Sequence, residues 1–407
     1  MSNEVSAPLR AISVFSGAGG MDLGLECAGF NTLLCLELDE NARETLRTNR
    51  PNWLVPDDGD VVTASRRFRP RDLGIERGDL DLLNGGPPCQ PFSSAAQWAA
   101  TGRMGMADVR ADTVHGVLDL IDAFLPRAVL LENVQGFVVG KNAALPEIEE
   151  RLRKINAQEG TSYRVEWRIL NAAHYGVPQN RRRAIILILR DGEPLNWPVP
   201  EYLVDTITAW DAIGELVVDD APRPTGKWTA LLPSIPEGRN YQWLTNEGGG
   251  PELFGYRTKF WNFLLKLDRS KPSWTLPASP GPSTGPFHWD NRPLSSTEAL
   301  RLQSFPLEWK LTGDHRQRVK LAGNATPPLL IELLGRALAT HLGSSGFDAP
   351  PTLLIPRSRA EKSVIHQAPL PAAYVDMIGA KARHAGEGAG PAPRGQKGAA
   401  AVEPADP

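Results

Sequence analysis

The chain has 407 residues, 41% of them hydrophobic, with 44 lysines and arginines against 47 aspartates and glutamates. These values exclude a peptide or a small stapled scaffold and predict a globular protein with two or three hydrophobic cores. The cysteines Cys27, Cys35 and Cys89 have no paired spacing, so neither a disulfide framework nor a metal site is expected. The longest aliphatic run, Ala184 to Leu189, is far shorter than the ~20 residues of a membrane span. We therefore expect a cytoplasmic protein.

Five short apolar runs in residues 1–190 predict β-strands, and helical periodicity lies between several of them. The runs are Ala11–Phe15, Leu33–Leu36, Leu80–Leu83, Ala128–Leu131 and Ala184–Leu189. This order predicts an α/β fold with a doubly wound, Rossmann-like sheet. Ligands of such sheets bind at the carboxyl ends of the strands, so the residues after each run are candidate site residues.

A glycine-rich turn follows the first run. It contains Phe15, Gly17, Gly19 and Gly20 and precedes a predicted helix. Such a turn lets backbone amides approach a ligand at a helix N-terminus. The spacing differs from the GxGxxG of dinucleotide-binding proteins, so the turn alone does not identify the ligand.

Acidic residues follow the second run at two places. Glu37 and Leu38 come directly after the strand, and Asp60 and Val61 follow about 20 residues later. A carboxylate at the end of the second strand is suited to accept hydrogen bonds from ribose hydroxyls. Together with the glycine turn, these residues predict a cofactor that contains a nucleoside.

A single cysteine stands after the third run, in the sequence Gly-Gly-Pro87-Pro88-Cys89-Gln90-Pro-Phe-Ser93. Prolines fix the backbone and hold the thiol in place. A buried inert cysteine does not need this surrounding sequence, so we interpret Cys89 as a reactive thiol. Residues 94–106, with two glycines, are a candidate closing loop.

The chain changes character after residue 190. Residues 191–290 are rich in proline and glycine, contain seven of the eleven tryptophans and predict a smaller, irregular domain. The tryptophans are expected to build its core, although some could stack on nucleic acid. Helical patterns at 296–303 and 328–342 predict that residues 291–345 return to the first domain, and residues 346–407 predict a flexible, disordered tail.

Six segments together resemble the DNA (cytosine-5)-methyltransferase family, in family order from residue 11 to about 342. Two of them are the glycine turn and the GGPPCQPFS segment around Cys89. The others are Glu132-Asn133-Val134, Gln179-Asn-Arg181-Arg-Arg183, the segment from Arg292 to Pro306, and Ala322-Gly-Asn324-Ala325-Thr326. Leu38 departs from the pattern, because the family often has an aromatic residue there.

The resemblance implies a cofactor, S-adenosylmethionine, and a set of site residues. Cys89 would be the nucleophile, Glu132 would bind the base, Arg183 would contact the base oxygen, and Arg181 would hold the catalytic loop. The implied cofactor residues are Phe15, Gly17, Gly19, Gly20, Glu37, Leu38, Asp60, Val61, Pro88, Asn324 and Ala325.

The implied partner is double-stranded DNA, and local charge agrees with it. Residues 160–190 contain six arginines and one glutamate, and residues 221–290 contain eight basic and five acidic residues. The expected DNA contacts are Gln90, Ser93, Gln179, Arg239, Arg257, Lys259, Lys271 and Arg292. The smaller domain would read the sequence, and a monomer is expected, associated with the bacterial nucleoid and accompanied by a cognate restriction endonuclease.

Three alternatives remain open. A tRNA-methylating enzyme shares the catalytic motifs, but the roughly 100 residues between the arginine motif and Arg292 favour DNA. A binding protein that has lost catalysis is disfavoured by the presence of Cys89, Glu132 and Asn324. A nicotinamide oxidoreductase is disfavoured by the spacing of the glycines.

Overall fold

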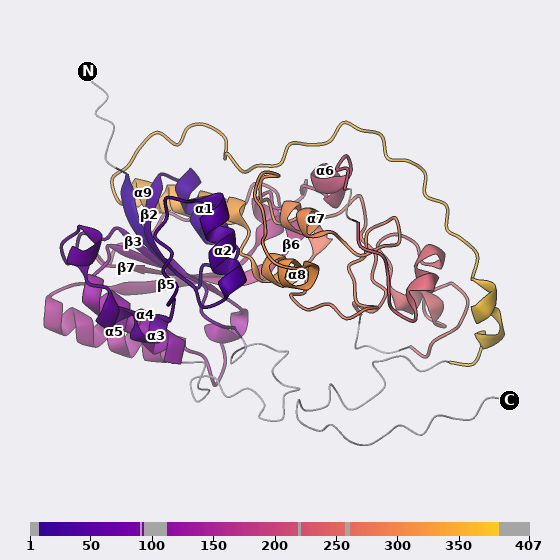
Figure 1. The fold of residues 1–407 in the computed structure, drawn as a ribbon, viewed down its shortest axis with the longest axis horizontal. Helices are drawn as coiled ribbons and strands as arrows, with labels where there is room; N and C mark the ends of the chain where they lie inside the picture. The colour runs from indigo at the N-terminus through magenta and orange to yellow at the C-terminus, as the bar shows by residue number, and fades with distance from the viewer. Residues whose placement is uncertain (1–7, 90–91, 93–111, 219–220, 257–260, 382–407) are drawn as a thin grey trace.

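The computed structural model describes residues 8–89, 92, 112–218, 221–256 and 261–381, which form two lobes (Figure 1). The larger lobe contains a six-stranded sheet. The smaller lobe, residues 221–287, consists of loops and short 3₁₀ turns around a core of its own. Among the described residues, the helices are too short or too polar to cross a membrane.

The sheet has the strand order β2-β1-β3-β4-β7-β5. The first four strands in this order are parallel, and β7 is antiparallel to both of its neighbours. The strands are β1 (Leu9–Val14), β2 (Phe30–Leu36), β3 (Leu82–Gly85), β4 (Ala128–Asn133), β5 (Arg164–Asn171) and β7 (Arg182–Leu189). All five predicted strands are therefore present, and the predicted α/β fold class is confirmed.

Helices cover both faces of the sheet, because alternate side chains of each strand enter two different cores. In β1, Leu9 and Ala11 enter one core, while Ile12 and Val14 enter the other. Helices α1, α2 and α9 pack on the first face, and α3, α4 and α5 pack on the second (Figure 1). The result is a three-layered lobe with the carboxyl ends of the parallel strands at one edge.

Several helices begin at residues whose side chains cap them. Asp39 accepts hydrogen bonds from the first backbone N–H groups of α2, and Ser295 and Glu298 form a capping box at α7. Helices α7 and α9 confirm the two helices predicted in residues 291–345. The helices are α1 (Gly20–Cys27), α2 (Glu40–Asn49), α3 (Val61–Arg67), α4 (Asp112–Phe124), α5 (Leu145–Glu159), α6 (Ala209–Ile213), α7 (Ser296–Arg301), α8 (His315–Asn324) and α9 (Pro328–His341).

Strand β5 was not predicted from the sequence. It lies at the edge of the sheet, and most of its side chains are exposed or only half buried. Three of its eight residues, Arg164, Glu166 and Arg168, are charged. An edge strand with this composition lacks the apolar run that marks the buried strands.

The segment after residue 190 packs partly on the larger lobe. Trp197, Trp210 and Trp289 belong to the core shared with α1 and α9, whereas Trp228 belongs to the core of the smaller lobe. A short strand β6 (Gln179–Asn180) pairs with β8 (Ser273–Trp274) and joins the two lobes. The domain boundaries at 190, 290 and 345 stay predictions.

Residues 346–381, which belong to the tail predicted to be disordered, run over both lobes (Figure 1). Leu353 and Ile355 enter the core beside α9, and the buried carboxylate of Glu332 accepts hydrogen bonds from the N–H groups of Thr352 and Leu353. The composition suggested disorder because these few apolar anchors are diluted by proline and polar residues. Residues 382–407 lie outside the described residues.

We expect Ile355→Ala to lower the free energy of unfolding by about 2–5 kcal/mol, the usual effect of emptying a fully buried site. Ile355 is only 1% exposed. Val364→Ala is the control, because Val364 is 79% exposed in the same segment and its truncation leaves no cavity. Urea denaturation measures both variants, and equal stabilities would contradict the packing of this segment.

Candidate active site

A cavity of about 560 Å³ lies at the carboxyl ends of the parallel strands. Its lining combines residues from five of the six motifs with residues that follow the second strand, all far apart in the sequence. Among them are Phe15, Gly17, Gly20, Glu37, Leu38, Pro88, Cys89, Glu132, Arg181, Arg183, Asn324 and Ala325. All four predicted catalytic residues and most of the predicted cofactor residues therefore meet in one place.

The glycine turn connects β1 to α1 through left-handed backbone conformations. Gly19 caps α1 with φ of 81°, and a Cβ there would lie 2.8 Å from the ring of Trp309. A Cβ on Gly20 would lie 2.0 Å from the carbonyl oxygen of Thr326. Gly20 therefore lets the segment before α9 approach the turn. Gly19 faces Trp309 and does not belong to the cavity lining.

The carboxylate of Glu37 fixes the turn to the end of β2. Its two oxygens accept the backbone N–H groups of Gly17 and Asp39, both at 2.8 Å. Burial raises the pKa of Glu37, and the bonds from Asp39 and Gly17 partly oppose this rise. Next to it, the side chain of Leu38 is 63% exposed at the cavity, which gives the site an uncovered apolar surface.

Asp60 and Val61 do not line the cavity. The Asp60 carboxylate accepts the N–H of Val62 at 3.0 Å and caps α3, while the side chain of Val61 is buried in the second core. The residue before them, Gly59, packs closely against Glu37 of the cavity. A Cβ on Gly59 would lie 2.1 Å from the carbonyl oxygen of Glu37.

Cys89 follows the Pro87-Pro88 pair and is half buried. The side-chain amide of Asn133 donates to the Pro87 carbonyl at 3.0 Å, and its oxygen accepts the N–H of Val134 at 2.9 Å. Asn133 therefore ties the end of β4 to the cysteine segment. Asn133 was not predicted as a site residue, and its position directly after Glu132 is the sequence signal that marks it.

The thiol of Cys89 lies among three charged groups. Burial raises its pKa, the positive charge of Arg183 lowers it, the negative charge of Glu132 raises it, and Arg181 lowers it. The net direction is upward. In the free protein the thiol is therefore mainly protonated at neutral pH.

Glu132 and Arg183 form an ion pair inside the cavity. Nε of Arg183 lies 3.0 Å from Oε1 of Glu132, and their side chains are 19% and 10% exposed. The N–H of Arg183 does not point along this line, so Oε1 has no aligned hydrogen-bond donor within the described part of the chain. The carboxylate is thus held by charge and keeps capacity to bind a ligand.

Arg181 is a buried link between the arginine motif and the end of α8. Its guanidinium donates to the carbonyls of Gly323 and Asn324 at 3.1 and 3.4 Å. Burial, and then the charge of Arg183, lower the pKa of Arg181 to about 9. The side chain is only 3% exposed, so it positions the cavity wall.

The structure places two predicted DNA contacts away from the open surface. Gln179 is fully buried in β6, which pairs with β8. Arg292 uses its guanidinium for two bonds to the buried carboxylate of Glu298, at 2.9 and 2.7 Å. Gln179 is therefore enclosed by protein and Arg292 has a partner within the protein, whereas both were expected to contact DNA at the surface.

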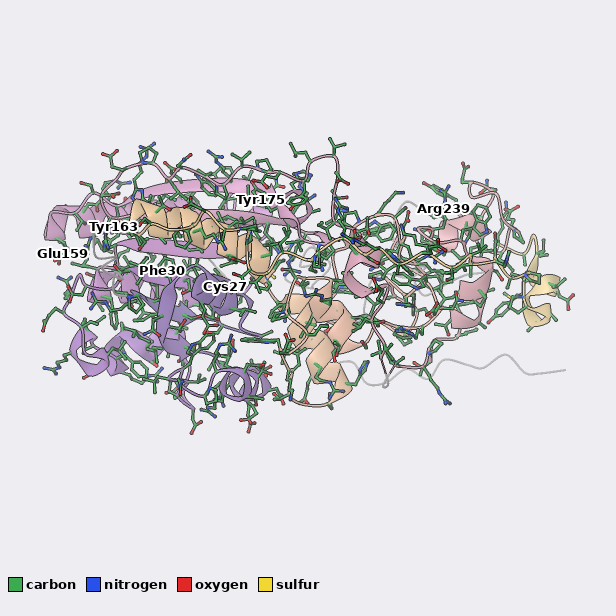
Figure 2. The ribbon with its side chains drawn as sticks, turned by 90° about the horizontal axis from the view of Figure 1, so that it is seen from above. Cys27, Phe30, Glu159, Tyr163, Tyr175 and Arg239 are labelled. Atoms are coloured by element: carbon green, nitrogen blue, oxygen red, sulfur yellow. The ribbon has the colours of Figure 1, made fainter. Side chains whose placement is uncertain are left out.

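The other predicted DNA contacts divide into two groups. Arg239 is exposed at the surface of the smaller lobe, at the far end from Glu159 and Tyr163 (Figure 2), and Lys271 is exposed beside Asp268 at 3.1 Å. The other four, and the candidate closing loop, lie outside the described residues: Gln90, Ser93, Arg257, Lys259 and 94–106.

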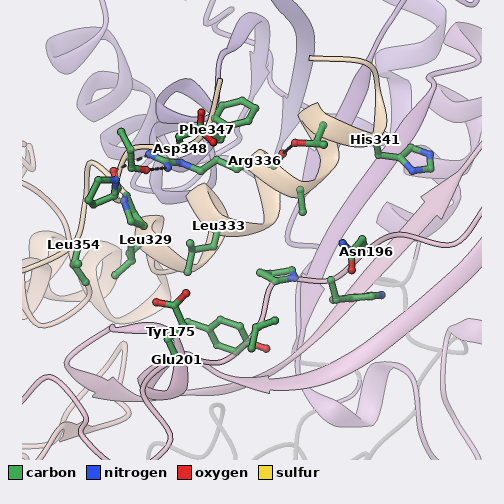
Figure 3. A pocket seen from close by; sticks show the side chains of 18 of the residues that line it. Tyr175, Asn196, Glu201, Leu329, Leu333, Arg336, His341, Phe347, Asp348 and Leu354 are labelled. Atoms are coloured by element: carbon green, nitrogen blue, oxygen red, sulfur yellow. Dashed lines mark hydrogen bonds between the residues drawn. The ribbon is translucent and has the colours of Figure 1, made fainter. Parts of the chain in front are cut away.

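A second cavity of about 840 Å³ lies between α9, residues 194–202 and residues 347–354 (Figure 3). Two of its titratable groups, Arg336 and His341, have internal partners. Arg336 binds Glu332 and the carbonyl of Ala349, and His341 lies 2.8 Å from Asp191. These contacts are typical of a structural junction, so the chemistry is better placed in the cavity around Cys89.

We expect iodoacetamide to alkylate Cys89 before the other two cysteines, with a rate that rises as pH increases. Burial raises the pKa of Cys27 to about 12, and that of the fully buried Cys35 well above its ordinary value. Arg183→Gln removes the cation that lowers the Cys89 pKa, so its alkylation midpoint should move to higher pH.

Mass spectrometry of the alkylated peptides measures this profile. Arg164→Gln is the control, because the Arg164 side chain is 59% exposed on the sheet edge. An unchanged midpoint in Arg183→Gln would show that this arginine does not act on the thiol.

The chain matches the family model described as C-5 cytosine-specific DNA methylase over residues 9–340. It is 32% identical to the Type II methyltransferase M.SacI of Streptomyces achromogenes, over 82% of this chain and 94% of that protein. It is also 32% identical to the Type II methyltransferase M.Sau96I of Staphylococcus aureus, with coverage of 82% and 76%.

The fold is similar to that of the methyltransferase EhMeth of Entamoeba histolytica, with a TM-score of 0.55 and 16% identity. That match covers 83% of this chain and 99% of the other, and at this identity it bears on the fold alone. The sequence matches bear on the family. The chain belongs to the C-5 cytosine-specific DNA methylase family.

Proposed function

We propose that this protein transfers a methyl group from S-adenosylmethionine to carbon 5 of a cytosine extruded from duplex DNA. The observation that carries the proposal is the single cavity that joins Cys89, Glu132 and Arg183 to the glycine turn. A nucleophile, a group that binds the base and a cofactor cradle must share one space for this reaction.

The residues around the turn fit S-adenosylmethionine. Gly17 and Gly20 line the cavity without side chains that would narrow it, and the exposed side chain of Leu38 offers an apolar surface to an adenine. Each oxygen of Glu37 accepts one backbone N–H and keeps a further lone pair for a ribose hydroxyl. Asn324 and Ala325 close the opposite wall. When bound, the cofactor supplies an electrophilic methyl group.

Cys89 provides the covalent step. Its thiolate adds to carbon 6 of the cytosine, a sulfur–carbon bond forms, and the electron pair makes carbon 5 nucleophilic. After carbon 5 has taken the methyl group, water removes its proton and the sulfur–carbon bond breaks. The raised pKa of the free thiol means that binding must favour the thiolate, and cationic groups beside the sulfur do this.

Glu132 and Arg183 stabilise the base during addition. The Glu132 carboxyl binds ring nitrogen 3 and the exocyclic amine, and Arg183 contacts the base oxygen. Their ion pair at 3.0 Å places both groups on the same wall of the cavity. Arg181 acts as a positioning residue, since its guanidinium is used by the Gly323 and Asn324 carbonyls.

The substrate is double-stranded DNA. Carbon 5 and carbon 6 are not accessible to a thiol and a cofactor inside a stacked duplex, so the cytosine must leave the helix. Exposed Arg239 and Lys271 in the smaller lobe are suited to contact phosphates. We further propose that the protein acts as a monomer, in the bacterial cytoplasm at the nucleoid, together with a restriction endonuclease that cuts the same site.

Methyl transfer to duplex DNA tests the proposal. The protein should incorporate labelled methyl groups from S-adenosylmethionine into duplex DNA, and Cys89→Ser should lower the rate by roughly 10³-fold or more while retaining cofactor binding. Cys27→Ser is the matched control, because Cys27 does not line the cavity. A duplex carrying 5-fluorocytosine should trap a covalent adduct with Cys89.

Bisulfite sequencing of DNA from cells that express the protein identifies the methylated sequence. A parallel assay with tRNA separates the two substrate classes. Label in tRNA alone would exclude duplex DNA as the substrate, and activity of Cys89→Ser equal to the wild type would exclude the covalent step.

Leu38→Asp should weaken S-adenosylmethionine binding about tenfold, because a charge replaces the apolar surface offered to the adenine. Calorimetric titration with the cofactor, and with NAD as a competing candidate, measures this effect. Leu203→Asp is the control, since Leu203 is 59% exposed outside the cavity. Equal cofactor affinity in both variants would place the adenine elsewhere.

A further inference from the structure

One tryptophan of residues 191–290 is placed unlike the others. Six of the seven belong to a hydrophobic core or pack against one. Trp261 is 48% exposed. Its ring lies on that of Trp274, with centroids 6.1 Å apart and an angle of 56° between the planes. Trp274 in turn packs against the large core, so the exposed ring has a firm support.

This pair stands beside the strand that leads into the catalytic arginines. Trp274 is in β8 and pairs with Asn180 of β6, which directly precedes Arg181. The hydroxyl of Thr275 donates to the Asn180 carbonyl at 2.7 Å, and the N–H of Ser273 donates to the Pro178 carbonyl at 2.9 Å. The aromatic pair is thus fixed where the smaller lobe meets the wall of the cavity.

The backbone of Trp261 is fixed as well. The side-chain amide of Asn240 donates to its carbonyl, and the neighbouring residue Arg239 is exposed. A supported aromatic ring, with an exposed cation next in sequence to the residue that binds its backbone, is suited to a partner with flat apolar faces and negative charge. A nucleic acid has both properties, because each base has a stacking face and each phosphate a charge.

We propose that Trp261, supported by Trp274, stacks on a nucleotide of the bound duplex next to the extruded cytosine. The inference rests on the proposed function. Extrusion removes the stacking partner of the neighbouring bases, and the ring of Trp261, held on Trp274 beside the strand that leads to Arg181, replaces part of that contact. Trp261 is therefore a positioning residue for the DNA.

The experiment uses the full chain and a fluorescent duplex that contains the methylated sequence. Trp261→Ala should weaken binding about tenfold or more, the effect expected from loss of one base–aromatic contact, and Trp261→Phe should restore most of it. Trp167→Ala is the matched control, because Trp167 is 39% exposed on the sheet edge. Affinity for S-adenosylmethionine should be unchanged in all three variants.

Salt dependence separates stacking from a contact to phosphate. The slope of log affinity against log salt should not change in Trp261→Ala, whereas Arg239→Ala should reduce it by about one if that side chain binds a phosphate. With 2-aminopurine beside the target cytosine, fluorescence in the complex should be higher for Trp261→Ala than for the wild type, because stacking quenches it.

The outcomes distinguish this inference from the function on which it rests. If the wild type methylates duplex DNA and Trp261→Ala binds it equally well, the inference is wrong and the proposed function stands. If Trp261→Ala lowers the salt slope, the ring does not act by stacking. If the wild type neither binds nor methylates duplex DNA, both the function and the inference are wrong.

Discussion

The geometry of the cavity depends on a buried guanidinium. Arg181 binds the carbonyls of Gly323 and Asn324 at the end of α8, where the helix carries partial negative charge. Taking a charged group out of water is unfavourable, and the lowered pKa of Arg181, about 9, reflects this burial. The hydrogen bonds to the two carbonyls offset part of this unfavourable free energy of burial. Because the next segment, at Thr326, touches the glycine turn, one side chain connects the arginine strand to the wall of the cavity formed by this turn.

The charges near Cys89 are arranged in opposition. Arg183 favours the thiolate and Glu132 disfavours it, while the two form an ion pair with each other. A cytosine that binds Glu132 through nitrogen 3 and its amine would engage the carboxylate that otherwise opposes thiolate formation. The arrangement then couples occupation of the cavity to activation of the sulfur, and it limits reaction of the thiol in the free protein.

Much of this site was predictable because its residues follow buried strands. An apolar run of β-branched and aliphatic residues marks β1 or β4 in the sequence, and the residue after it falls at the ligand-binding edge. The same reasoning could not find β5, an edge strand in which charged residues interrupt the apolar run. Local sequence also could not place Gln179 and Arg292. Tertiary contacts bury Gln179, and they bring Glu298 to Arg292 as its partner.

Residues 346–381 also show that local composition does not determine which residues become buried. Its composition has too few apolar residues to form a core alone, but Leu353 and Ile355 enter a core made by other segments. Further along, Tyr374 lies on Trp228 in the smaller lobe, with centroids 5.9 Å apart. One segment therefore contacts both lobes, which no count of residue types within it could indicate.

The two lobes are fixed to each other at several independent places. Besides the tail and the β6–β8 pair, Lys266 donates to the carbonyl of Ile235 and to Asn291, which lies beside the Arg292–Glu298 pair. Burial lowers the pKa of Lys266 to about 8 and that of His288 to about 4, so this junction is tightly enclosed. A junction with so many buried contacts resists bending, because opening it would break these hydrogen bonds and expose buried apolar surface to water. In the proposed reaction, the deformation that brings a cytosine to Cys89 would then fall mainly on the DNA, whose bases can leave the stack for a few kcal/mol.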